Sequence, residues 1–348
     1  MPNVDATTTN GTSRARPLDE VMTGANGPGA PPLRVEGGRR GGKRSGEPTP
    51  RSYYDLPVLN KPVWGAPDIP GYLFLGGLAG AGAVVSAAAQ LTGRRELARS
   101  TKVVNAGAIG LSLFALVHDL GRRGRFLNML RVFKVTSPMS VGSWLLAGFA
   151  PAVAGAAISE LTGRVKPIGA MATAGAAALG PAVATYTAAL ISDTAVPAWH
   201  DGHTVMPFVF ASSAVTSAAG LGLALAPVAE SGPLKPLGAL AGLAELGLTK
   251  AMEKKTGLAE TTYHEGRAGM LMGASELLLV CGAALTATSG RSRTRRAAGG
   301  MAVFTGSLLT RFGIFEAGNA STQRPEYTVE PQRRRVKDRS NGREDGRG

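Results

Sequence analysis

The sequence predicts an all-α fold, namely a polytopic membrane bundle of eight transmembrane helices. Charged residues make up 18% of the 348 residues, whereas soluble domains carry roughly 25%. The charges are also unevenly placed, because the 256 residues from 61 to 316 contain only 35 of them. Most of these stand between long apolar runs, which is typical of helical membrane proteins.

Eight apolar runs support the count of eight helices. Each spans about 18 to 25 residues, enough to cross a hydrocarbon layer of ~30 Å as a helix. A membrane barrel would show shorter segments of alternating polarity instead. In chain order the runs are Pro70–Leu91, Val103–Leu120, Val141–Leu161, Pro167–Ile191, Val205–Ala229, Leu234–Met252, Ala268–Ser289 and Ala297–Glu316.

The two ends of the chain differ in composition from the middle. Residues 1–60 are rich in Gly, Pro, Arg and Ser and contain no apolar stretch long enough for a core. Residues 317–348 are basic and show no periodicity. We therefore expect a disordered basic N-terminal tail over 1–60, a transmembrane domain over 61–316 and a disordered basic C-terminal tail over 317–348.

An even number of crossings puts both tails on one side of the membrane, here named side A. The opposite side, side B, holds connections with basic residues but without histidine or tryptophan. All histidines and tryptophans fall at side A, and they are His118, His200, His203, His264, Trp64, Trp144 and Trp199. The chemistry of the protein is therefore expected at side A.

Three ionisable residues interrupt the apolar runs at similar depth. Glu245, Glu276 and Arg311 lie about 8 to 12 Å from the side A ends of their helices. An unpaired charge there would cost several kcal/mol, so Arg311 is predicted to pair with Glu276, Glu245 or both. Such a pair would tie helices together, or it would belong to a proton path or ligand pocket that opens on side A.

A polar segment follows the second run. His118 and Asp119 end the helix, and such a pair suits proton transfer at a membrane surface. The same two residues also fit an ordinary helix terminus without a function. With Glu245, Glu276 and Arg311 they are the candidate catalytic residues. Five basic residues follow as topology signals or as a docking patch for an acidic partner. These candidate partner-binding residues are Arg122, Arg123, Arg125, Arg131 and Lys134.

The cysteine and histidine pattern limits the redox chemistry of the chain. A single cysteine, Cys281, cannot hold an iron–sulfur cluster. The histidines are not set in facing pairs within helices, as haem ligation would need, and His200-Asp201-Gly202-His203 fits a solvated loop better than a metal site. We expect no haem, no iron–sulfur cluster and no metal site in this chain.

Several motifs together resemble one known family. They are Tyr53-Tyr54-Asp55-Leu56-Pro57 with Pro62-Val63-Trp64, Ile69-Pro70-Gly71-Tyr72, the stretch from His118 to Trp144, Thr194-Ala195-Val196-Pro197-Ala198-Trp199 and Thr310-Arg311-Phe312. Over about residues 52 to 330 the chain resembles the NrfD/PsrC family, the quinone-interacting membrane subunits of polysulfide-reductase-like oxidoreductases. The family usually has proline where this chain has Arg123.

The resemblance implies a multi-pass protein of the cell membrane, surrounded by lipid, that binds a quinone or quinol (menaquinone or ubiquinone) near side A. It implies electron exchange with an iron–sulfur partner subunit, which connects to a molybdopterin catalytic subunit, and no nucleic-acid partner. Expected quinone contacts, besides His118 and Asp119, are Tyr72, Trp144, Asp193 and His200. A secondary transporter or proton-conducting module, or a pure membrane anchor, remain alternatives.

Overall fold

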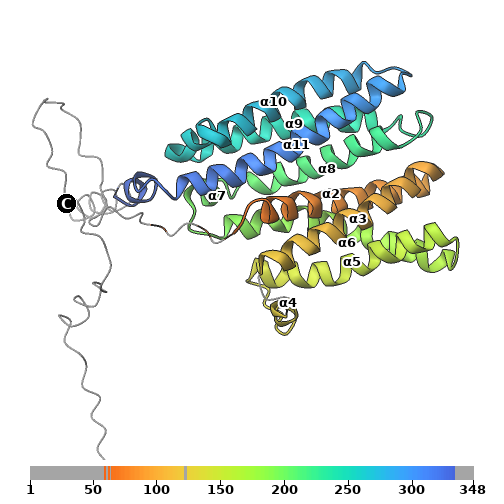
Figure 1. The fold of residues 1–348 in the computed structure, drawn as a ribbon, viewed down its shortest axis with the longest axis horizontal. Coiled ribbons are helices and arrows are strands. Elements are labelled where there is room, and N and C mark those ends of the chain that lie inside the picture. Colours follow the sequence, from red (N-terminus) through yellow and green to blue (C-terminus); the bar gives the residue numbers. More distant parts are fainter. Residues whose placement is uncertain (1–58, 60–61, 63, 121–123, 334–348) are drawn as a thin grey trace, which may run out of the picture. The chain divides into compact units, whose positions relative to one another are not determined.

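The computed structural model describes residues 59, 62, 64–120 and 124–333, and these residues form helices joined by short connections, with no strand among them (Figure 1). Eight of these helices have 20 to 29 residues. The long helices are α2 (Asp68–Leu91), α3 (Arg95–Asp119), α5 (Pro138–Thr162), α6 (Lys166–Ser192), α8 (Met206–Leu225), α9 (Leu234–Lys255), α10 (Gly266–Ala287) and α11 (Arg293–Ser321). Short helices α4 (Arg125–Met129), α7 (Pro197–His200) and η1 (Gly257–Tyr263) lie in the connections.

The predicted all-α polytopic bundle is confirmed. Each long helix overlaps one of the eight apolar runs. By length and composition, seven of the long helices within the described residues can cross a membrane. The exception is α9, which contains Lys235, Glu245, Lys250 and Glu253 and ends with Lys254 and Lys255.

The last helix is longer than the sequence predicts. It continues past the expected boundary at Glu316 to Ser321, and residues 326–333 are helical as well. The reason is packing, since Gly318 leaves the space in which the Trp199 ring lies against α11. Most of the two expected tails, residues 1–58 and 334–348, lies outside the described residues.

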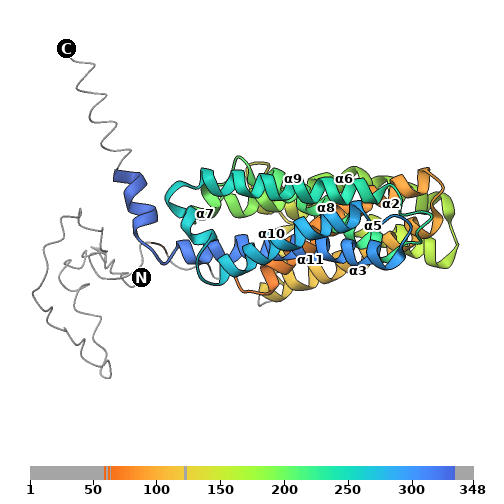
Figure 2. The same ribbon diagram turned by 90° about the horizontal axis from the view of Figure 1, so that it is seen from above.

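The long helices form two groups of four. The first consists of α2, α3, α5 and α6, and the second of α8, α9, α10 and α11. The groups meet where α8 packs against α2 and α6 (Figures 1 and 2). Glycine allows close approach within the first group, because a Cβ on Gly80 of α2 would lie 2.5 Å from the carbonyl oxygen of Gly180 in α6.

Local signals set several helix ends. Ser137 accepts a hydrogen bond from the Ser140 amide at 3.4 Å, and Pro138 occupies the first helical position of α5. The same helix ends at Gly163, whose φ of 65° is the left-handed conformation that glycine adopts without strain.

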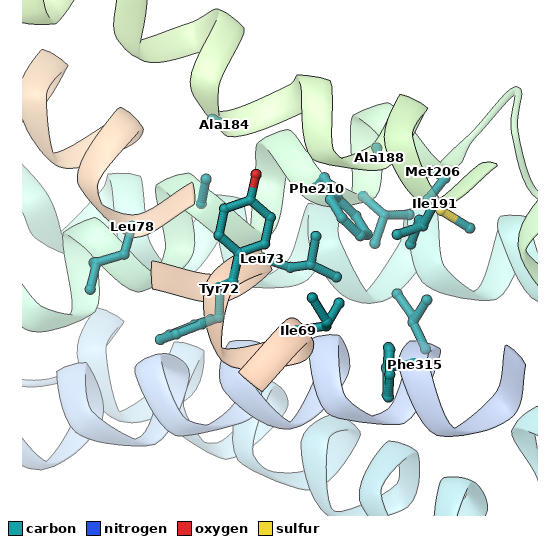
Figure 3. Close-up of a cluster of buried hydrophobic side chains, with 14 of the residues drawn as sticks. Ile69, Tyr72, Leu73, Leu78, Ala184, Ala188, Ile191, Met206, Phe210 and Phe315 are labelled. Atoms are coloured by element: carbon teal, nitrogen blue, oxygen red, sulfur yellow. The ribbon is translucent and has the colours of Figure 1, made fainter. Parts of the chain in front are cut away.

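Between the two groups of helices lies a continuous apolar core to which α2, α6, α8 and α11 contribute (Figure 3).

Candidate functional site

A pocket lies near side A within the first group of helices. Its walls come from α2, α3, α5 and α6, with Trp64 from the segment before α2 and Met129 from α4. Most of its lining side chains are apolar, and its free volume is about 70 Å³. The polar groups that reach it are Tyr72, Asp119, Ser143 and Tyr186.

Two tyrosines from facing helices meet in this pocket. Figure 3 shows the Tyr72 ring extending from α2 toward the helix that carries Ala184, which is α6. There its hydroxyl is hydrogen-bonded to the hydroxyl of Tyr186. Tyr72 is also held through its backbone, because Ser112 of α3 donates to its carbonyl oxygen at 3.1 Å. The pocket thus presents two phenolic groups in largely apolar surroundings.

A glycine on α5 makes room for the second tyrosine. A Cβ on Gly142 would lie 2.7 Å from Cδ2 of Tyr186 and closer still to Cε2. Real Cβ atoms essentially never approach a neighbour so closely, so only glycine allows the Tyr186 ring to pack at this point. Tyr186 was absent from the expected site, although a tyrosine within an alanine-rich apolar run was the available signal.

Asp119 and Trp64 lie where the pocket approaches side A. Asp119 is the last residue of α3, and its Oδ1 accepts a hydrogen bond from the Gly65 amide at 3.1 Å. Trp64 stacks on Trp199 with ring centroids 5.8 Å apart, and Trp199 Nε1 donates to the carbonyl oxygen of Ile314 in α11 at 2.8 Å. The pocket opening is therefore connected through aromatic rings to the second group of helices.

His118 and Trp144 lie outside the pocket lining. The imidazole of His118 is 66% exposed, its Nδ1–H donates to Asp68 Oδ2 at 2.7 Å, and its ring stacks on Phe114 one turn earlier. The indole of Trp144 is half exposed, and it makes an edge contact with Phe133. Of the expected quinone contacts, only Tyr72 and Asp119 line the pocket.

Asp193 and His200 also lie apart from the pocket. Asp193 is exposed at the C-terminal end of α6, and His200 is exposed at the end of α7 with Nδ1 3.2 Å from the Ser192 carbonyl oxygen. Beside them, η1 packs against α7 through Tyr263, whose hydroxyl donates to the Ala198 carbonyl at 2.9 Å. Burial raises the pKa of Tyr263, so its phenol stays protonated.

The expected partner-binding residues are only partly described. Arg122 and Arg123 lie outside the described residues, and for Arg125 the backbone alone is described, as the first residue of α4. Arg131 and Lys134 are exposed in the segment between α4 and α5. Val132, Phe133 and Val135 of the same segment are exposed by 61% or more. A basic and apolar surface therefore adjoins the pocket at side A.

Arg311 does not form the direct ion pair that the sequence predicts. Its guanidinium is buried, and it donates to Ser213 Oγ at 3.0 Å and to the Phe210 carbonyl at 2.7 Å. It also lies over the Phe210 ring, 3.6 Å from the centroid. Glu245 is reached only indirectly, because Ser307 Oγ stands 2.7 Å from Ser213 Oγ and 3.1 Å from Glu245 Oε1. Two serines thus separate the charges.

Glu276 has a different partner from the one expected. It pairs with Lys250 of α9, and both side chains are about one-third exposed. The prediction that Arg311 pairs with Glu276 is therefore wrong. Equal depth along two helices does not bring side chains together when the helices present them in different directions.

Comparison with protein families identifies the family of the chain. The model of the NrfD family, described as polysulphide reductase, matches residues 57–244, which is more than half of the chain. The chain belongs to the NrfD family. The match runs from before α2 into α9, so it includes all four helices that form the Tyr72–Tyr186 pocket. The resemblance seen in the sequence is confirmed.

Membership of the NrfD family, together with seven apolar helices, makes the chain a multi-pass integral membrane protein. It also makes it a membrane subunit of a respiratory oxidoreductase, which works with other subunits of that enzyme. Comparison with curated proteins gives no match.

Proposed function

We propose that this NrfD-family subunit binds a quinone or quinol in the Tyr72–Tyr186 pocket and exchanges electrons with an iron–sulfur partner subunit at side A. The observation that carries the proposal is the pair of phenolic hydroxyls from α2 and α6 in an apolar pocket beside the Asp119 carboxyl group. An aromatic headgroup fits apolar walls, and its oxygen atoms need hydrogen-bond donors and a route for protons.

The size of the pocket indicates how a headgroup would enter. A cavity of about 150 Å³ holds a benzene ring, and the free volume here is about 70 Å³. The pocket must therefore widen for a ring to enter, and in this proposal it does so as the Tyr72 and Tyr186 hydroxyls separate. The same hydroxyls would then donate to the oxygen atoms of the headgroup, so the bond that is lost is replaced.

Asp119 is positioned for proton exchange. It lies between the pocket and the solvent at side A, and Oδ1 is held by the Gly65 amide. A carboxylate in this place accepts a proton from a bound quinol and releases it to side A, or works in the opposite direction. The quinone itself supplies the two-electron chemistry, while the chain binds it, orients it and moves protons.

The exposed segment between α4 and α5 supports partner docking at side A. Arg131 and Lys134 provide positive charge beside exposed Val132 and Phe133, and Met129 of the preceding helix lines the pocket. An acidic surface of an iron–sulfur subunit would complement these residues, and a molybdopterin catalytic subunit would connect beyond it. Charge reversal of Arg131 and Lys134 should slow association most at low ionic strength.

Binding of a fluorescent quinol analogue to the purified full chain in lipid nanodiscs tests the proposal. The double variant Tyr72→Phe with Tyr186→Phe loses both donors, at about 1 kcal/mol each, so its affinity should fall more than tenfold. Tyr327→Phe, which loses a hydroxyl bonded to Thr261 outside the pocket, is the matched control. Unchanged affinity in the double variant would refute this site.

Two other outcomes would favour the alternative functions. Absence of quinol-analogue binding in the complete complex would favour a membrane anchor, and solute movement in liposomes by the chain alone would favour a transporter.

A further inference from the structure

A line of buried polar groups runs along one face of α9. Glu253, Thr249 and Glu245 are spaced four residues apart, and their exposed fractions are 2%, 3% and 0%. Each has a buried oxygen without a hydrogen-bond partner in the described part of the chain, namely Glu253 Oε1, Thr249 Oγ1 and Glu245 Oε2. Buried polar atoms are nearly always bonded, and α9 carries three of the eight buried side-chain atoms that lack a partner in the described structure, all three on one helix face.

Thr249 belongs, with Thr187 and Thr286, to the buried threonines whose hydroxyl has no hydrogen-bond partner in the described structure. Thr101, Thr173 and Thr216 each donate to the carbonyl oxygen four residues earlier, as helical threonines commonly do. Thr249 makes no such bond to Glu245 in the described structure. Its hydroxyl is therefore available to a partner beside the helix.

The spacing of these groups matches a file of single water molecules. Four helical residues rise about 6 Å, and one water that makes two hydrogen bonds of about 2.8 Å spans nearly this length. One water between Glu253 and Thr249, and another between Thr249 and Glu245, would satisfy the free oxygens. Buried waters commonly take this role.

The outer end of the line reaches side A. Glu253 Oε2 lies 3.1 Å from Lys250 Nζ and 3.5 Å from Nε2 of His264, whose imidazole is half exposed. Lys250 also pairs with Glu276 of α10. Ionisable side chains of α9, of His264 directly after η1 and of α10 therefore surround the outer end of the line.

The inner end is the buried centre formed by Glu245, two serines and Arg311. Thr216 and Thr310 also face the Glu245 carboxyl group, but each is engaged with a backbone carbonyl. Arg311 closes this end, where its guanidinium lies against Gly77 of α2. The chain of polar groups thus leads from side A to the junction of the two helix groups.

Toward side B the line is blocked. Val303 is completely buried, and a Cβ on Gly282 would lie 2.8 Å from its Cγ1. A Cβ on Gly220 would lie 2.5 Å from the Gly300 carbonyl oxygen, so the backbones of α8 and α11 are in direct contact. This close packing on the side B side of Glu245 is the reason to place the inner end of the line at Glu245.

We propose that the file Glu253–Thr249–Glu245 is a one-sided proton path that connects side A with the Glu245–Arg311 centre. A proton from His264 or Glu253 passes to a water, across the Thr249 hydroxyl and through a second water to Glu245. Each carrier accepts one proton and releases one, so the net change is the conversion of the Glu245 carboxylate to the acid. The path lies in the second helix group and stands independently of the quinone pocket.

Infrared measurement of hydrogen–deuterium exchange at Glu245 tests the path in the purified full chain. The carboxylic acid band of Glu245, assigned by its loss in Glu245→Gln, should appear as the pH is lowered and shift promptly on transfer to deuterated buffer. Thr249→Val interrupts the file and should slow this shift at least tenfold. Thr249→Ser retains a hydroxyl and should exchange like the wild type.

Thr173→Val, which removes a buried hydroxyl of α6 away from the file, is the matched control and should exchange like the wild type. Three results would overturn the proposal: equal exchange in Thr249→Val and the wild type, exchange over hours in the wild type, or no Glu245 acid band at any pH. Each would mean that the buried groups only stabilise the bundle.

Discussion

Replacing Gly142 by alanine should disable the quinone pocket without removing any of its polar groups. The new Cβ would lie 2.7 Å from Cδ2 of Tyr186, and ordinary contact begins at 3.4 Å. The ring must therefore move by at least about 0.7 Å, which separates the Tyr186 hydroxyl from Tyr72. Overpacking of this kind costs about 1 to 3 kcal/mol of stability.

The effect of Gly142→Ala on quinol-linked turnover should exceed its effect on quinol binding. Loss of one donor weakens analogue binding by about fivefold, whereas a group misplaced by about 1 Å lowers turnover by up to about 10²-fold. Analogue binding in nanodiscs and quinol-linked turnover of the complete complex measure the two effects. Gly148→Ala on the same helix is the control, because its Cβ meets only Leu179 Cδ1 at 3.4 Å. Wild-type binding and turnover in Gly142→Ala would refute the placement of Tyr186 in the site.

Three further experiments test separate parts of the account. Asp119→Asn should retain analogue binding but lower quinol-linked turnover about 10²-fold, as expected for loss of a proton acceptor; full turnover would remove Asp119 from the mechanism. Arg311→Leu leaves Glu245 without a nearby cation and should destabilise the bundle by about 3 kcal/mol or more. Glu276→Gln breaks only the partly exposed pair with Lys250 and should cost less than about 1 kcal/mol. If thermal unfolding showed Glu276→Gln to be the more destabilising variant, the assignment of Arg311 to the buried centre would be contradicted. Gly80→Ala should lower the melting temperature by separating α2 from α6, whereas Gly107→Ala, with open space around it, should not; equal melting temperatures would argue against close helix contact.

The helices were predictable because apolar length alone determines which segments can span a membrane. All eight runs became long helices, and the charges of α9 explain why it alone fails the criteria for a membrane span. The end of α11 was harder to predict. Residues after Glu316 are small rather than strongly apolar, and the packing of Gly318 against Trp199 extends the helix.

The direction of side chains could not be predicted from sequence spacing. His118 and Asp119 are neighbours, yet successive helical residues point about 100° apart. Asp119 consequently lines the pocket, while His118 stacks on Phe114 at the surface. In the same way, similar depth of Glu276 and Arg311 gave no information on which helices are adjacent or which faces they present.

Tyr186 illustrates a further limit. Its role depends on Gly142 and Tyr72, two residues from other helices that only the folded structure brings beside it. The sequence shows a single tyrosine in an alanine-rich run, which equally suits a core position.

Photoaffinity labelling with an azido-quinone tests the central claim most directly. After illumination of the complete complex in its native membrane, mass spectrometry locates the labelled residues. The account predicts label on the pocket segments of α2 and α6, around Tyr72 and Tyr186, that excess unmodified quinone prevents. Specific label confined to α9, α10 or α11, or label that quinone fails to displace, would contradict it.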